Sequence, residues 1–381
     1  MSQRTLTGRN PRTGQPLRVT VADGLIHSIA PGPEDEPFWL SAGFIDLQVN
    51  GYAGYDLNAE TLDPDVVLAL VEKLARTGVT TFVPTLITAP EEKIIRALGA
   101  IGEVRAASAL AAHAIPYVHV EGPHIAAEDG ARGAHPREWV RPPSLAEFER
   151  WQAASDGLVG MVTLSPHWEG ANEYIAALVA RGIHVAIGHT HAGAGQIHAA
   201  AAAGATLSTH LGNGIAGMLP RHPNPIWAQL ADERLNATFI ADGHHLPADT
   251  LKAMLRAKGT EHSILVSDSV SLAGMPPGVY DMPIGGRVEL TADGRASVAG
   301  TSVLAGAVKP LKDGIAWATV SGACSLADAV RMATENPGRF AGNRGLFRLT
   351  EPADLVRFSL DASSATLRID TVLVEGGEIG E

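Results

Sequence analysis

Residues 43–54 read GFIDLQVNGYAG, an apolar strand pattern that runs directly into a glycine-rich turn. Seven further runs of this kind follow, most of them separated by stretches with helical periodicity. They centre on TTFVPTLIT, IPYVHVEGP, GMVTLSPH, HVAIGHTHA, TLSTHLGNG, NATFIADGHH and SILVSDSVS. Strands that alternate with helices indicate a parallel sheet, and eight such strands predict an α/β fold of the (β/α)₈ TIM barrel type.

The stretch after the first strand illustrates the helical pattern. In DVVLALVEKLARTG, the apolar side chains of Val66, Leu70, Val71 and Leu74 share one helical face. Gly78 stands where a glycine ends many helices. We therefore expect an amphipathic helix that packs against the barrel.

The two ends of the chain have a different pattern. Residues 16–30, PLRVTVADGLIHSIA, read as a hairpin that turns at Asp23-Gly24. Residues 353–379 also read as strands and turns. We expect residues 1–42 and 345–381 to form one small β-sandwich domain, beside a barrel of residues 43–344.

Composition excludes several classes of protein. The net charge of the 381 residues is −12 and the pI is about 5.7, with no basic patch, so we expect no nucleic-acid partner. The apolar runs are too short for a membrane span, and the first ten residues lack the apolar core of a signal peptide. With Cys324 as the single cysteine, a cytoplasmic protein is expected.

Polar residues recur where the predicted strands end. The carboxyl ends of barrel strands meet on one face, which is the catalytic face of such folds. The residues are Gln48, Glu121, His167, His189, His210, His245 and Asp268.

Three of these residues have the chemistry of a metal site. Glu121, His189 and His210 offer one carboxylate and two imidazoles, and a catalytic site needs three protein ligands and one open position. Zinc is the first candidate, and iron, cobalt and manganese also suit such ligands. The alternative is that each residue is a hydrogen-bonded polar group of the interior.

Asp268 is the candidate catalytic residue. A carboxylate at the end of the eighth strand could take a proton from a metal-activated water and return it to a leaving amine. The alternative is that Asp268 caps the N-terminus of a helix.

Several motifs together resemble one family. HVEGPH, GAH, GHTHA, THLGNG, IADGHHL, VSDS and AGMPPGVYD resemble, over nearly the whole chain, the N-acetylglucosamine-6-phosphate deacetylases of the amidohydrolase superfamily. The resemblance implies metal-dependent hydrolysis of the acetamido group of N-acetyl-D-glucosamine 6-phosphate, which gives D-glucosamine 6-phosphate and acetate in amino-sugar catabolism.

The resemblance also bears on the opening stretch. Some members of the family carry His-x-His there and hold two metals, whereas others carry Gln-x-Asn and hold one. Gln48 and Asn50 place this chain with the second group, because neutral amides are poorer ligands for a transition ion than imidazole. The resemblance implies one divalent ion per subunit and makes Gln48 and Asn50 vestigial second-metal positions.

The resemblance further implies a substrate site. His135 would contact the acetamido group, Asn213 would receive the phosphate or the sugar, and His245 would help to hold the ligand. Arg221 would reach across a homodimer interface and grip the 6-phosphate. The full expected set is Ala134, His135, Asn213, Gly214, Arg221, His245, Ala299 and Gly300. His244, next to His245, is expected to be structural.

One difference from the family's usual sequence leaves more than one substrate possible. The family often shows Arg-Glu-Pro-Gly after the sixth strand, whereas residues 220–225 here read PRHPNP. The substrate could therefore be another N-acetylhexosamine, either galactosamine 6-phosphate in its acetylated form or an unphosphorylated sugar. A third reading is a catalytically dead barrel that serves as a binding module. The joint presence of the Glu-His-His set and Asp268 counts against that reading.

Overall fold

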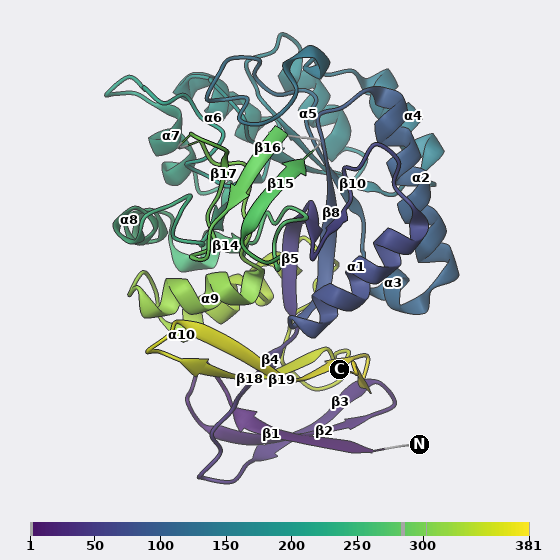
Figure 1. The fold of residues 1–381 in the computed structure, drawn as a ribbon, viewed down its shortest axis with the longest axis vertical. Helices are drawn as coiled ribbons and strands as arrows, with labels where there is room; N and C mark the ends of the chain where they lie inside the picture. The colour runs from purple at the N-terminus through teal and green to yellow at the C-terminus, as the bar shows by residue number, and fades with distance from the viewer. Residues whose placement is uncertain (1–2, 283–285, 302, 381) are drawn as a thin grey trace.

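Eight parallel strands form a barrel in chain order, as the sequence predicts. The computed structural model describes residues 3–282, 286–301 and 303–380, and Figure 1 shows the barrel above a smaller β-domain. The barrel strands are β5 (Phe44–Val49), β8 (Val79–Ile87), β9 (Val118–Glu121), β10 (Val159–Leu164), β11 (His184–Ile187), β12 (Leu207–Ser208), β13 (Asn236–Ile240) and β14 (Ser263–Val266).

The barrel is closed by main-chain hydrogen bonds between its first and last strands. The Asp268 N–H donates to the Gln48 carbonyl at 3.0 Å, and the Asn50 N–H donates to the Ser269 carbonyl at 2.8 Å. Val49 and Ser269 form a parallel bridge at the same level. Closure thus places the ends of β5 and β14 side by side on the face where all eight strands end.

Helices surround the barrel on its outside (Figure 1). They are α1 (Pro64–Arg76), α2 (Glu91–Ala107), α3 (Ala109–Ala114), α4 (Leu145–Ala154), α5 (Ala171–Val179), α6 (Ala194–Ala202), α7 (Pro225–Ala231), α8 (Ala248–Lys258), α9 (Leu311–Val320), α10 (Leu326–Met332) and α11 (Glu335–Gly338). Of the helices described, none is both long enough and apolar enough to cross a lipid bilayer.

Helix α1 is the helix expected after the first strand. It starts after Asp63, whose side chain accepts a hydrogen bond from the Asp65 N–H. Val67, rather than Val66, is the valine of the first turn that becomes fully buried. Gly78 follows the helix with φ +89°, in the left-handed region that favours glycine.

Both termini build one accessory β-domain, as expected. Its strands are β1 (Arg4–Arg9), β2 (Pro16–Ala22), β3 (Leu25–Pro31), β4 (Trp39–Ala42), β18 (Leu355–Asp361), β19 (Thr366–Val374) and β20 (Gly377–Glu378), in the order β20-β19-β18-β4-β1-β2-β3. The predicted hairpin is the pair β2–β3, and positive φ at both Asp23 and Gly24 forms its turn.

The sheet of the β-domain joins two halves. β1 and β4 share one registered pair, Arg9 with Trp39, and one apolar cluster contains side chains of both halves, such as Val19 and Leu355. The domain therefore has a hydrophobic core of its own beneath the barrel.

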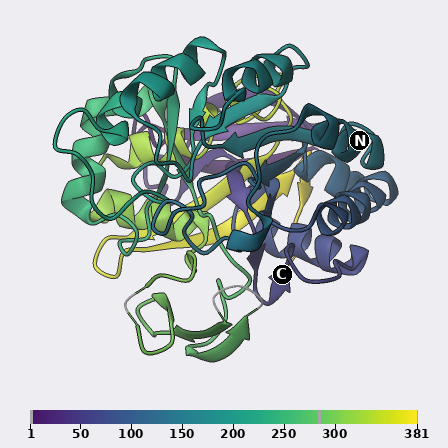
Figure 2. The same cartoon turned by 90° about the horizontal axis from the view of Figure 1, so that it is seen from above.

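A third sheet was not expected from the sequence. Strands β15 (Gly278–Met282), β16 (Gly286–Leu290) and β17 (Ala296–Val298) form an antiparallel meander after the last barrel strand. Figure 2 shows this meander standing out from the barrel. Its apolar core, which includes Val288 and Leu290, also contains Leu272 and Ala273 from the loop after β14.

Candidate active site

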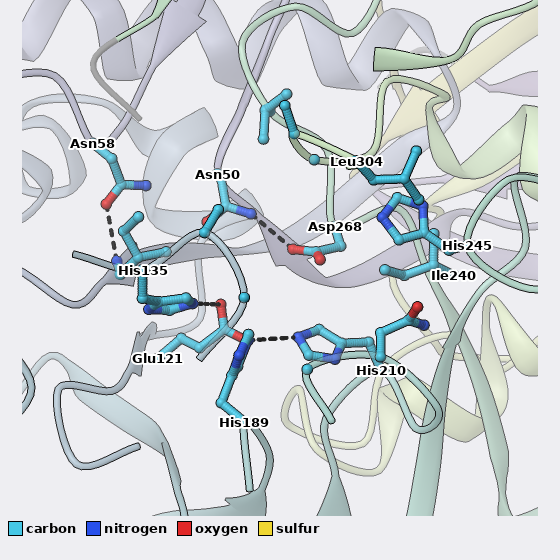
Figure 3. Close-up of a pocket in the computed structure, with 18 of the residues that line it drawn as sticks. Asn50, Asn58, Glu121, His135, His189, His210, Ile240, His245, Asp268 and Leu304 are labelled. Atoms are coloured by element: carbon cyan, nitrogen blue, oxygen red, sulfur yellow. Dashed lines mark hydrogen bonds and ion pairs between the residues drawn. The ribbon is translucent and has the colours of Figure 1, made fainter. Parts of the chain in front are cut away.

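A cavity of about 270 Å³ lies at the carboxyl ends of the barrel strands. It brings together most of the residues that the sequence singles out (Figure 3). Those in its lining are Asn50, Glu121, Ala134, His135, His189, His210, Asn213, Gly214, His245 and Asp268.

The carboxylate and two imidazoles expected to hold a metal converge at one point. The Nε2 atom of His210 lies 3.0 Å from Oε1 of Glu121 and 3.1 Å from Nε2 of His189. The ligand atoms of the three residues all lie within 4.8 Å of one another, and this is the single such group among the described residues.

The donor set fits a divalent ion. Nδ1 of His189 lies 2.9 Å from the Ala131 carbonyl, which can only accept, so Nδ1 carries the proton of the neutral ring. The lone pair of the neutral ring is then on Nε2, which faces Nε2 of His210. Two imidazole nitrogens and a carboxylate oxygen at these distances can all be satisfied by one cation.

Burial and proximity shift the protonation equilibria of these groups. Burial alone would raise the pKa of Glu121, but the imidazoles of His189 and His210 beside it outweigh burial and hold the pKa well below its usual range. Burial likewise lowers the pKa of His210, but Glu121 overrides it and raises the pKa to about 9. Without a metal, Glu121 is therefore ionised and His210 is protonated, so a cation that binds there must displace the proton of His210.

Asp268 stands beside this cluster. Burial, reinforced by the negative charge of Glu121, raises the pKa of Asp268 to about 6. A general acid–base group works best with a pKa near the working pH. A β-bridge at Ser269 and then a turn follow Asp268, so the alternative role as a helix N-cap is excluded.

The backbone is strained at three of these residues. His189, His210 and Asp268 have φ values of +47°, +28° and +49°, in a region that side-chain-bearing residues seldom adopt. Such strain persists where surrounding structure over-determines it, which is common at functional sites. Two glycines flank the His189 ring, because a Cβ atom on Gly214 would lie 2.8 Å from Nδ1 and one on Gly133 would lie 3.2 Å from Cε1.

Two further histidines line the cavity. Nδ1 of His135 lies 2.8 Å from the Thr88 hydroxyl, and burial together with His189 lowers the pKa of His135 to about 3, so the ring is neutral. Nδ1 of His245 lies 2.7 Å from the Asp242 carboxylate, which leaves Nε2 for a ligand. Nε2 of His244 instead lies 3.2 Å from the carbonyl oxygen of Asp293, and His244 does not line the cavity.

Some of the residues singled out in the sequence lie elsewhere. Arg221, Ala299 and Gly300 are outside the lining of this cavity. His167 is also outside, and its ring lies tilted against that of His191 with centroids 4.3 Å apart. Gln48 is 2% exposed and donates to Glu121 from behind the cavity.

The structure adds residues that the sequence reasoning missed. Asp56 and Asn58 follow the first strand, and Met282, Leu304 and residues 305–306 come from the meander and its return. The glycine-rich turn after Asn50 could have pointed to the first two. The others lack a motif, because they reach the cavity through the unexpected third sheet.

A family model matches most of the chain. Residues 39–379 match the model described as the amidohydrolase family. The chain is 31% identical to the N-acetylglucosamine-6-phosphate deacetylase of Bacillus subtilis (strain 168), over 90% of this chain and 89% of that protein. It is also 31% identical to the N-acetylgalactosamine-6-phosphate deacetylase of Escherichia coli O157:H7, over 94% of this chain and 93% of that protein.

Solved structures are similar to the whole fold. The N-acetyl-D-glucosamine-6-phosphate deacetylase of Mycobacterium smegmatis superposes with a TM-score of 0.88 at 29% identity, and covers 99% of this chain and 100% of that one. A mutant of the same enzyme in complex with N-acetyl-D-glucosamine-6-phosphate gives a TM-score of 0.87 over 100% of both chains.

The packing around His189 yields a prediction. Gly214→Ala should reduce metal retention by about tenfold or more, because the new Cβ would overlap the ring and φ there is +57°. Elemental analysis after dialysis measures the retention. Gly217→Ala in the same loop is the control, since its Cβ would meet no atom within 4 Å. Equal metal content in both variants would contradict the role given to this packing.

Proposed function

The chain belongs to the amidohydrolase family, and from that premise we propose that it hydrolyses the acetamido group of N-acetyl-D-glucosamine 6-phosphate to give D-glucosamine 6-phosphate and acetate. The observation that carries the proposal is the cavity in which Asp268 faces the cluster of Glu121, His189 and His210. Relatives that bear this activity in their names match along nearly the whole chain.

The proposed reaction divides its work among the residues of the cavity. One divalent ion per subunit, with zinc as the first candidate, would be held by Glu121, His189 and His210 and would polarise the acyl carbonyl and acidify a water. Asp268 accepts a proton from the attacking water. It then donates that proton to the amine nitrogen as the carbon–nitrogen bond breaks, so that acetate and the amino sugar leave.

A neutral histidine suits the binding of a polar, uncharged acetamido group. His135 stays neutral in its buried position and can share a hydrogen with the substrate's amide. His245 is oriented by Asp242 and can contact a sugar hydroxyl or the phosphate through Nε2. Ala134, Asn213 and Gly214 complete the polar wall that we assign to the sugar.

A second candidate substrate is N-acetylgalactosamine 6-phosphate. The relative from Escherichia coli O157:H7 that is named for this sugar matches at the same 31% identity as the glucosamine enzyme of Bacillus subtilis. Sequence identity therefore does not distinguish the two epimers as substrates. A comparison of turnover on the two sugars does distinguish them.

Acetate release from a panel of sugars tests the function. The panel contains N-acetylglucosamine, N-acetylgalactosamine and the 6-phosphate of each. We expect the highest kcat/KM on N-acetylglucosamine 6-phosphate, loss of turnover in a metal-depleted chain, and recovery when about one equivalent of zinc is added. Full turnover without metal, or acetate release from none of the four sugars, would refute the proposal.

Asp268→Asn separates proton transfer from binding. The amide is nearly isosteric with the carboxyl group but cannot accept the water's proton, so kcat should fall by about 10²–10⁴-fold while the metal is retained. Single-turnover acetate release and elemental analysis measure the two effects. A loss of less than about tenfold would contradict the assigned role.

We further propose that the active protein is a homodimer in which Arg221 reaches the partner's cavity. Arg221 is exposed and has no ion pair among the described residues. It lies in the stretch between Met218, 92% exposed, and Trp227, 54% exposed, and exposed large apolar residues of this kind favour a subunit interface. The loop is anchored because the Asn224 side chain caps α7.

Guanidinium suits the gripping of a phosphate, because its planar fork bonds two oxygens at once. Arg221→Ala should therefore raise KM for the 6-phosphate about tenfold or more while it barely changes KM for the free sugar. Arg256→Ala, at an exposed arginine of α8, is the control. An equal effect of Arg221→Ala on both substrates, or a fully active monomer by light scattering, would exclude the shared site.

A further inference from the structure

Each of the two amides at the end of β5 donates a hydrogen bond to a carboxylate of the site. Nε2 of Gln48 donates to Oε1 of Glu121 at 2.9 Å. Nδ2 of Asn50 donates to Oδ1 of Asp268 at 2.8 Å, and Figure 3 shows this contact across the cavity. The two residues that the sequence marks as vestigial thus contact the metal-site carboxylate and the catalytic carboxylate.

We propose that Gln48 and Asn50 are a pair of positioning residues with separate tasks. Gln48 orients the metal-facing oxygen of Glu121 and so sets the affinity of the site for its cation. Asn50 holds the Asp268 carboxylate in place and so sets the rate of proton transfer. The second half of the inference rests on the proposed function of Asp268.

The contact made by Gln48 falls on the oxygen that matters for the metal. Oε1 of Glu121 is the atom that lies 3.0 Å from His210 Nε2 and 3.4 Å from His189 Nε2, whereas Oε2 faces His135 at 3.9 Å. A donor on Oε1 therefore fixes the direction in which its remaining lone pair points. Such outer hydrogen bonds orient ligands and tune metal affinity.

The hydrogen bond from Asn50 likewise gives the two oxygens of the Asp268 carboxylate different surroundings. Oδ1 receives the amide, and Oδ2 has no hydrogen-bond partner among the residues described. Because one oxygen is engaged, the other is the one available to exchange a proton with water and then with the leaving amine.

The main chain that carries both amides is fixed by hydrogen bonds. The Asn50 N–H donates to the Ser269 carbonyl at 2.8 Å, and its own carbonyl accepts from the Leu57 N–H at 2.9 Å. The Gln48 carbonyl accepts the N–H of Asp268 at 3.0 Å. Gln48 and Asn50 are 2% and 8% exposed, so neither side chain has free rotation into solvent.

Only one orientation of each amide is favourable. An ionised carboxylate has acceptors and no donor, so a flipped amide would place its oxygen against a carboxylate oxygen. A carboxylate in place of either amide would repel its partner, and an apolar side chain would leave a buried carboxylate oxygen without its donor. Residue type at both positions is therefore constrained by the site's own charges.

Two variants and two matched controls test the division of tasks. Gln48→Met and Asn50→Leu remove the amides at nearly constant volume, and Gln15→Met and Asn172→Leu make the same changes at exposed positions. Zinc affinity is measured on the metal-free full-length chain by competition with a chelator, and kcat and KM are measured at saturating zinc. Thermal unfolding of the metal-free chain reports stability.

Gln48→Met should weaken zinc binding about 10–100-fold. Asn50→Leu should bind zinc within about threefold of the parent but lower kcat by about tenfold or more, with a smaller change in KM. Asn50→Ala, which adds no apolar bulk, should repeat the loss of kcat if Asn50→Leu folds poorly. Both controls should match the parent in all three measurements.

The inference is overturned if Gln48→Met binds zinc like the parent in an active enzyme, or if Asn50→Leu and Asn50→Ala keep the parent's kcat. It is also overturned if both variants lose zinc, turnover and thermal stability in parallel, because the amides would then serve packing alone. A parent chain that releases no acetate would instead refute the proposed function, and the zinc measurement, which needs no substrate, would still decide the role of Gln48.

Discussion

The main-chain contact between the first and last barrel strands is the constraint on which the site depends. The Asp268 N–H is tied to the Gln48 carbonyl, and the Asn50 N–H to the Ser269 carbonyl. These bonds close the barrel and, at the same time, hold Asp268 at a positive φ beside the ligand cluster. Loss of these bonds would displace Asp268 from the cluster of Glu121, His189 and His210 before it disrupted the apolar core of the barrel.

The strained backbone of the site lowers the free energy of unfolding of the chain. Residues held in the left-handed region cost of the order of 1–3 kcal/mol each, and His189, His210 and Asp268 are in this state. The cost is offset by a large apolar core, in which side chains such as Phe44, Phe82 and Trp151 are fully buried. We infer that substitutions which relax these turns would stabilise the fold and harm the site.

Much of the fold could be predicted from the sequence, because its elements are local. Strand and helix periodicity located all eight barrel strands, and the Asp23-Gly24 turn located the hairpin. The polar residues of the site could be found because each ends a strand, and parallel strands must end together. The position of His167, which ends a strand but lies outside the cavity, shows the limit of that rule.

What could not be predicted depends on contacts between distant parts of the chain. The strands of the meander from β15 to β17 have 5, 5 and 3 residues, so each alternating pattern is too short to be distinguished from a loop. Its contribution to the cavity, through Met282 and Leu304, follows from how it folds back on the barrel. The hydrogen bonds of Gln48 and Asn50 likewise join residues 73 and 218 positions apart, a relation that no local pattern contains.

The pairing of the two chain ends in one sheet has a consequence for biosynthesis. Strand β4 leaves the ribosome early, whereas its antiparallel partner β18 is made roughly three hundred residues later. At translation rates of about 5–20 residues per second, the edge of β4 waits roughly 15–60 s for that partner. An unpaired strand edge is a template for association with other chains. The nascent chain therefore passes through a period in which this strand edge is open to association with other chains.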